Sequence, residues 1–196
     1  MKSQITIKKI QDLLIKGVQT IYVDDDTSRR MWWASLEVIQ KDFLSQNYKQ
    51  GGIWVASPLP AFNDKKFLNQ LHGWLWSPEG FPYFQNENAG FLPVNNSEKI
   101  KKDFDLVSNY KVLNLSQEDG YEPFLMIITP NFQCILSIVG EKDKKILLMK
   151  CDEESLKLSI ELMHAKLNQE NYEEGVKFRN AINNLGNLNI NNQFEK

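Results

Sequence analysis

The longest hydrophobic pattern of the chain lies between residues 121 and 167. Three apolar runs, FLMIIT, FQCILSIV and KILLMKC, are separated by a turn that contains Pro130 and by the polar segment EKDK. Continuous runs of this kind are typical of strands that are covered on both faces. We therefore expect one strand at residues 124–129, followed by a hairpin of two strands around EKDK.

A C-terminal helix is expected directly after this hairpin. Asp152 can cap the helix, and its apolar stripe recurs at helical spacing, at Leu156, Ile160, Met163 and Leu167. The segment SLKLSIEL also alternates as a strand would, but its Glu, Lys and Leu content favours a helix. Phe178, Ile182 and Leu185 form a second stripe, so the helix continues or restarts after Gly175. We expect the helix to leave the body of the domain, with the first stripe packed against the sheet or against a second copy.

The N-terminal third of the chain shows helix and strand patterns in alternation. Ser3 can cap a first helix, whose apolar positions are Ile7, Ile10 and Leu14. Residues 18–23 (VQTIYV) and 53–56 (IWVA) are rich in β-branched and aromatic residues and are predicted as strands. Between them lies the clearest helix of the chain, with one apolar stripe at Trp32, Leu36, Ile39 and Phe43.

The middle of the chain contains weaker patterns. Trp74 and Trp76 are two residues apart, which predicts an edge strand with both indoles on one face. Residues 78–96 are rich in Pro, Gly and Asn and are predicted as a loop. A helix near residues 97–107 and a strand at residues 111–115 follow. Together these elements predict a single α+β domain over residues 1–170, with a largely antiparallel sheet flanked by helices, and a helical extension with a flexible tail over residues 171–196.

The composition is that of an ordinary globular domain, with 42% hydrophobic and 24% charged residues in 196. A formal net charge of -2 provides no general attraction to nucleic acid or to anionic lipid. The sequence has no run of 18 apolar residues, so no membrane span is expected. The first residues lack the apolar core of a signal peptide, and two cysteines do not make a disulfide framework. We expect a cytoplasmic protein.

The acidic triplet Asp24, Asp25 and Asp26 is the most suggestive chemical motif. Carboxylates at the end of a strand can hold Mg²⁺, as in response-regulator receivers. In this chain a helix precedes the strand, and IWVA does not end in a phosphoacceptor aspartate. A helix cap with solvated neighbours is therefore the better interpretation, and a metal-dependent enzyme that uses the triplet remains an alternative.

Neither histidine nor cysteine residues form a catalytic or metal-binding motif. His164 is followed by Ala165, where a histidine-kinase acceptor box has an acid, and no proline follows nearby. Cys134 and Cys151 lie in the two hairpin strands and are expected to be small buried hydrophobic residues. The spacing of these side chains matches no zinc pattern, and phosphate-binding and hydrolase motifs are absent from the sequence. We predict no catalytic residue, no metal and no cofactor.

Aromatic residues are dense in the first half of the chain. Core packing accounts for most of them, and the remainder indicate a small-molecule pocket or a partner surface. The segment WLWSPEGFPYFQNENAGF has no interleaved Lys or Arg, which argues against stacking on nucleic acid. The candidate ligand-binding residues are Trp54, His72, Trp74, Trp76 and Tyr83. A pocket lined by the three tryptophans would favour a ligand sensor, and a flat aromatic patch over residues 74–93 would favour a scaffold or assembly factor.

Residues 121–167 also resemble the end of a sensory domain in cyanobacterial signalling proteins. There, a strand ending in a TPxF-like turn leads into a core hairpin and an acid-capped helix. The matching residues in this chain are Leu125, Thr129, Pro130 and Phe132. IYVDDDTSRRMWWASLEVI and GIWVASPLP are similar to N-terminal parts of such proteins. The chain thus resembles GAF-like or DICT-like sensory modules of two-component histidine kinases.

This resemblance implies a GAF/PAS-like α+β fold and a non-catalytic sensory or regulatory role. Such a module would bind a small ligand or a partner protein and relay the change through its C-terminal helix, by a shift of that helix or of its packing in a homodimer. Kinase ATP-binding motifs are absent from the sequence. The chain would therefore act as a detached sensory domain or as a stand-alone regulator. An enzyme and a scaffold factor remain the alternatives.

Overall fold

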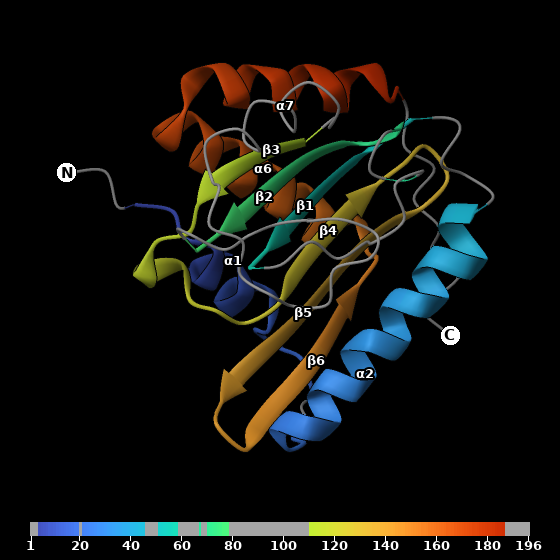
Figure 1. Cartoon of the computed structure of the whole chain (residues 1–196), viewed down its shortest axis with the longest axis vertical. Coiled ribbons are helices and arrows are strands. Elements are labelled where there is room, and N and C mark those ends of the chain that lie inside the picture. Colours follow the sequence, from blue (N-terminus) through green and yellow to red (C-terminus); the bar gives the residue numbers. More distant parts are fainter. Residues whose placement is uncertain are drawn as a thin grey trace, which may run out of the picture.

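The structure is a computed structural model, in which the described residues form one six-stranded mixed sheet with helices on both faces (Figure 1). The described residues are 4–19, 21–45, 51–58, 67, 70–78 and 110–186. The strands are β1 (Ile53–Ser57), β2 (His72–Ser77), β3 (Tyr110–Asn114), β4 (Phe124–Ile128), β5 (Gln133–Glu141) and β6 (Lys144–Lys150). Their spatial order is β3-β2-β1-β4-β5-β6.

The sheet has a parallel half and an antiparallel half. β1, β2 and β3 pair in parallel, whereas β4 runs antiparallel to β1 and continues into the antiparallel pairs β4–β5 and β5–β6. The prediction of a largely antiparallel sheet is therefore only partly correct: the fold is α+β, but the sheet is mixed. Parallel pairs require long crossover connections, and the strand pattern of a sequence does not show which connections are crossovers.

Four α-helices cover the sheet within the described residues. They are α1 (Ile7–Leu14), α2 (Asp25–Val38), α6 (Glu153–Glu170) and α7 (Tyr172–Asn184). Asp24 caps α2, Asp152 caps α6 and Asn171 caps α7, each through a side-chain oxygen that accepts a backbone N–H. A π-helical segment, Ile39–Leu44, extends α2.

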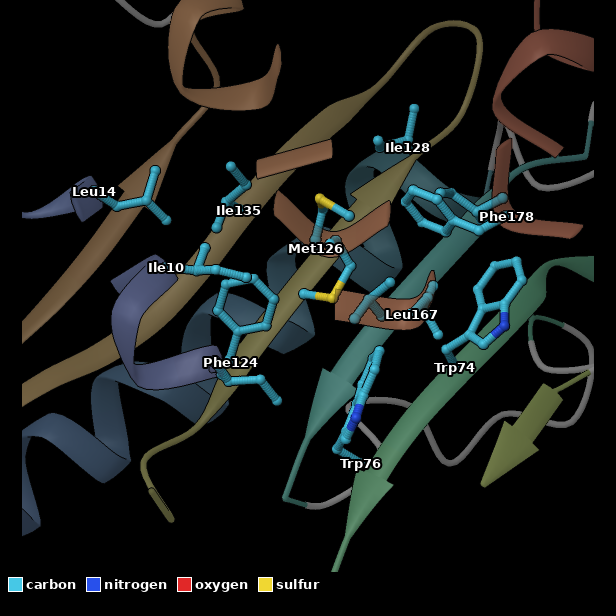
Figure 2. Packing of buried hydrophobic residues seen from close by; sticks show 14 of the residues in the cluster. Ile10, Leu14, Trp74, Trp76, Phe124, Met126, Ile128, Ile135, Leu167 and Phe178 are labelled. Atoms are coloured by element: carbon cyan, nitrogen blue, oxygen red, sulfur yellow. The ribbon is translucent and has the colours of Figure 1, made fainter. Parts of the chain in front are cut away.

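The two faces of the sheet bury two separate clusters of side chains. Trp54, Leu125 and Leu136 face α2, which contributes Trp32 and Leu36. The alternate positions face the other way, where α1, α6 and α7 cover them, as Figure 2 shows for the second cluster. Its labelled members are Ile10, Leu14, Trp74, Trp76, Phe124, Met126, Ile128, Ile135, Leu167 and Phe178. The prediction that the continuous apolar runs are covered on both faces is confirmed for β4 and for most of β5, but not for the edge strand β6, where Met149 is 43% exposed.

Two strand predictions are corrected. Residues 18–23 form no strand in the part of the chain that is described: Val23 makes a single bridge to Lys145, and Ile21 is 83% exposed. β2 is not an edge strand, because β1 and β3 flank it and β3 forms the edge. Both errors have one cause: local β propensity does not show whether a neighbouring strand is available.

The C-terminal helix does not leave the body of the protein. Leu156, Met163 and Leu167 are buried against the sheet, and Ile160 packs at the margin of the same cluster. The chain then breaks at Asn171 and restarts as α7, whose Phe178 is fully buried. Of the two partners that the apolar stripe predicted, the sheet is the one observed.

Candidate ligand-binding site

Trp74 and Trp76 on β2 both point toward α6 and α7, and each indole donates a hydrogen bond to a glutamate. The Trp74 Nε1–H donates to Glu174 Oε2 at 2.9 Å, and the Trp76 Nε1–H donates to Glu170 Oε2 at 2.7 Å. Glu170 is the last residue of α6 and Glu174 lies in the first turn of α7, so the two carboxylates stand on either side of the break at Asn171. We refer to these four residues as the Trp–Glu ladder.

A buried ion cluster lies at the Glu170 end of the ladder. The Lys166 Nζ is 2.6 Å from Asp119 Oδ1 and 2.6 Å from Glu170 Oε1, and it lies 5.4 Å from the centre of the Trp76 ring. The Lys166 and Asp119 side chains are 1% and 0% exposed. A buried lysine of this kind is tolerated only when it is paired and hydrogen-bonded.

Asp119 is the point where three parts of the chain meet. Its carboxylate accepts hydrogen bonds from Lys166 on α6, from the Ser116 hydroxyl and from the backbone N–H of Ile7, the first residue of α1. Burial raises the pKa of the Asp119 carboxyl, but the hydrogen bonds from Lys166, Ser116 and Ile7 outweigh it and lower the pKa overall. The cluster thus fixes α6 against the N-terminal helix as a charged pair.

Glu174 lies at the other end of the ladder and borders an open pocket. Its second oxygen accepts a hydrogen bond from Lys177 Nζ at 2.7 Å. Burial raises the pKa of Glu174, but the hydrogen bonds from Lys177 and Trp74, with the charge of Lys111 nearby, lower it overall. Both oxygens of this carboxylate are therefore occupied by donors, and the carboxylate remains ionised.

The pocket lies between the start of β2, the start of β3 and α7, and has a volume of about 550 Å³. Lys177, Asn180 and Asn184 stand at i, i+3 and i+7 of α7, so they share one helix face toward the pocket. The remaining lining residues are His72, Gly73, Trp74, Tyr110, Lys111, Glu174 and Ala181. The walls thus combine one aromatic surface with two ammonium groups and several amide groups.

The structure places the predicted ligand-binding residues in three different positions. His72 and Trp74 line the pocket, whereas Trp76 lies beyond them in the core against Glu170. Trp54 lies on the opposite face of the sheet, in the cluster beneath α2. Tyr83 and most of the aromatic segment 74–93 lie outside the described residues. A single pocket lined by all three tryptophans is therefore not formed.

Trp54 contacts the strand next to it through a glycine. Its indole lies over Gly73, where an added Cβ would fall 2.2 Å from Trp54 Cε2, and its ring centre is 5.4 Å from that of Tyr110. Gly73 pairs with Trp54 on one side and with Tyr110 on the other. The Trp54 Nε1 has no hydrogen-bond partner among the residues that the structure describes. Trp54, Gly73 and Tyr110 thus pack side by side across the three strands β1, β2 and β3.

The sequence interpretation missed the charged and amide residues of the pocket. Lys177, Asn180 and Asn184 do form a helical stripe in the sequence, and that polar stripe was the available signal. Its significance depends on Lys111, which reaches the same pocket from β3. The parallel pairing that brings β3 beside β2 was not predictable from the local pattern.

The acidic triplet serves the start of a helix. Asp24 Oδ1 accepts the backbone N–H of Thr27 at 2.6 Å, and Asp25 and Asp26 occupy the first turn of α2. Asp25 also lies 3.9 Å from Lys145 Nζ. Within the described ranges, no group of three or more His, Cys, Asp or Glu side chains is placed to hold a metal ion. No observation in this region favours the enzyme alternative.

Residues 8–196 match the model of a protein family described as a domain of unknown function (DUF8628). The chain belongs to this family. The match covers nearly the whole chain, so DUF8628 includes the mixed sheet, α6 and α7. No curated protein and no solved structure matches the chain. Among the helices that the structure describes, none has the length and apolar character needed to cross a membrane. The family description assigns no activity, and a function has to be argued from the site.

Proposed function

We propose that this chain is a non-catalytic sensory or regulatory module that binds a small, negatively charged ligand in the pocket between β2, β3 and α7. The observation that carries the proposal is the pocket itself, in which Trp74, Lys111 and Lys177 converge from a strand, an edge strand and a helix. Its volume of about 550 Å³ lies within the usual range of small-molecule sites, about 300–1,000 Å³.

The charges of the pocket favour an acidic ligand. Among the described residues that line the pocket, Glu174 is the one carboxylate, and donors from Trp74 and Lys177 already occupy its two oxygens. Lys111 and Lys177 together exceed it by one positive charge. Ammonium groups form their strongest hydrogen bonds with ionised oxygen acceptors, and the Asn180 and Asn184 amides can donate to the same group. A carboxylate or a phosphate ester therefore suits the site.

A ligand in this pocket would act on the helices that close the fold. α7 contacts the pocket through Lys177, Asn180 and Asn184, and the ladder connects Glu174 on α7 with Glu170 on α6. A ligand that binds one arrangement of α7 better than another shifts the population toward it. The resemblance of residues 121–167 to GAF-like or DICT-like sensory modules of bacterial two-component systems agrees with this role.

The proposal is tested by titration of the full chain with a panel of small carboxylates, sugar phosphates and nucleotides, followed by calorimetry. We expect at least one acidic compound to bind, and its uncharged analogue not to bind. Asn184→Asp adds a negative charge to the pocket and should weaken binding at least tenfold. Asn183→Asp is the matched control, because Asn183 is an exposed neighbour on α7 that does not line the pocket.

Two results would count against the proposal. The first is that no acidic compound in the panel binds to a chain that is folded by circular dichroism. The second is that Asn183→Asp and Asn184→Asp weaken binding equally, since this would place the ligand elsewhere.

A further inference from the structure

Cys134 and Cys151 face each other across the hairpin of β5 and β6. The register of this pair matches Ile135 with Lys150, so one further step places Cys151, the residue after β6, opposite Cys134. Both side chains belong to the cluster beneath α2, and the two thiols are near enough for hydrogen bonding between them to shift the pKa of each. Opposed residues of an antiparallel pair have Cα atoms about 4.5–5.5 Å apart, within the range of about 4.4–6.8 Å that a disulfide spans.

The two thiols differ in access and in acidity. Cys134 is 1% exposed, whereas Cys151 is only partly buried. The hydrogen bond with Cys151 and burial raise the pKa of Cys134 well above its usual value. The same hydrogen bond, in which Cys134 is the donor, lowers the pKa of Cys151, although burial and the nearby Asp152 oppose this effect. Cys151 is thus the better nucleophile and the more accessible one.

We propose that Cys134 and Cys151 are a redox site, in which the two thiols form a reversible intramolecular disulfide by exchange with a small-molecule disulfide. The Cys151 thiolate attacks one sulfur of the reagent and forms a mixed disulfide with it, while the other reagent sulfur leaves as a thiolate and takes up the proton that Cys151 released. Cys134 then loses its proton and attacks Cys151 Sγ, and the second reagent sulfur leaves as a thiol. Two protein thiols are oxidised and one reagent disulfide is reduced to two thiols.

The site lies next to the start of α6. Cys151 is followed directly by Asp152, whose side chain accepts the Ser155 N–H and caps the helix. A bond from Cys151 to Cys134 would hold this junction against the start of the neighbouring strand β5. The site is independent of the proposed ligand pocket, because neither cysteine lines that pocket.

The test is incubation of the full, folded chain with glutathione disulfide, followed by intact mass spectrometry and counting of free thiols. The wild-type protein should lose both thiols, with a mass decrease of two hydrogens and no retained glutathione. Dithiothreitol should restore both thiols. Cys134→Ala removes the resolving thiol and should retain one glutathione on Cys151. Cys151→Ala leaves only the buried thiol and should remain unmodified over the same time.

Three outcomes would overturn the proposal. They are a wild-type protein that keeps stable glutathione adducts, a wild-type protein that forms disulfides only between chains, and a folded wild-type protein that keeps both thiols. Circular dichroism of each variant establishes that it is folded, and the chain in denaturant establishes that the reagent is active. If Cys151→Ala is modified as fast as Cys134→Ala, the assignment of Cys151 as the attacking thiol is wrong.

Discussion

The Lys166 ammonium lies 2.6 Å from the Asp119 carboxylate, and both side chains are excluded from solvent. The pair connects α6 with the short 3₁₀ turn Gln117–Asp119, and through the Ile7 backbone with α1. These segments are far apart in the sequence. The ion pair therefore joins elements that also pack together in the second apolar cluster.

Lys166→Met should destabilise the protein by about 3–5 kcal/mol, because it leaves the Asp119 carboxylate buried without its partner charge. Lys157→Met is the matched control on the same helix. Lys157 is exposed and pairs with Glu153 at the surface, so its loss should cost less than about 1 kcal/mol. Urea denaturation followed by circular dichroism measures both values. Equal midpoints for the two variants would show that the buried pair has no special role.

Acid should unfold the protein through Asp119 and Glu174. The pKa of each carboxyl is lower in the folded chain than its usual value of 3.8 or 4.5. The unfolded chain thus binds more protons just below these values, and stability falls as the pH falls. We expect a stability that is constant above about pH 5 and declines from about pH 4.5 downward.

Asp119→Asn tests this prediction, and Asp12→Asn is its matched control. Asp12 is an exposed residue of α1. Asp119→Asn should reduce the loss of stability between pH 4.5 and pH 3, and Asp12→Asn should leave the slope of stability against pH unchanged. Denaturant midpoints measured at several pH values give both slopes. If Asp119→Asn keeps the wild-type slope, Asp119 is not the group that titrates.

Removing a donor from the Trp–Glu ladder should cost more than removing an exposed indole. Trp74→Phe deletes the Nε1–H that Glu174 accepts and should destabilise the protein by about 1–3 kcal/mol, because a buried acceptor loses its partner. Trp33 on α2 is 57% exposed, so Trp33→Phe is the control, with an expected cost below about 0.5 kcal/mol. The midpoints of thermal unfolding compare the stability of Trp74→Phe with that of Trp33→Phe. A Trp74→Phe variant as stable as Trp33→Phe would contradict this role for the hydrogen bond.

Gly73→Ala should destabilise the sheet through a clash with one named side chain. The added Cβ would lie 2.2 Å from Trp54 Cε2, and overpacking in a close-packed core costs about 1–3 kcal/mol. The same substitution in a Trp54→Leu background should cost at least about 1 kcal/mol less, since the clashing ring is gone. A double-mutant cycle of unfolding free energies tests this. Equal costs in both backgrounds would locate the strain elsewhere.

Local pattern predicted the elements that carry strong periodicity. The stripe of Trp32, Leu36 and Ile39 does face a core, and Asp24 and Asp152 do cap their helices. The hairpin of β5 and β6 is present, and Trp74 and Trp76 share a face of β2. These predictions depend only on neighbours within a few residues, where side-chain period and capping chemistry act.

The pairing of distant strands was decided by the tertiary structure. VQTIYV has the composition of a strand, but among its described residues the one bridge is that of Val23 to Lys145. Trp54 and Trp74 are both aromatic residues of buried strands, yet parallel pairing in register places them on opposite faces. A shift of one residue exchanges the faces of a strand, and no local signal reports that register.

By itself, the sequence determined the α+β class, the helix caps at Asp24 and Asp152 and the central hairpin, whereas the first helix is capped by Thr6 and not by Ser3. It could not determine the pocket or the Trp–Glu ladder, because each joins residues that lie far apart in the chain, and it did not show the register that places Cys134 opposite Cys151 in the hairpin. Lys166 shows the physical reason. A lysine in a helix is normally solvated, and only the arrival of Asp119 from another segment makes its burial stable.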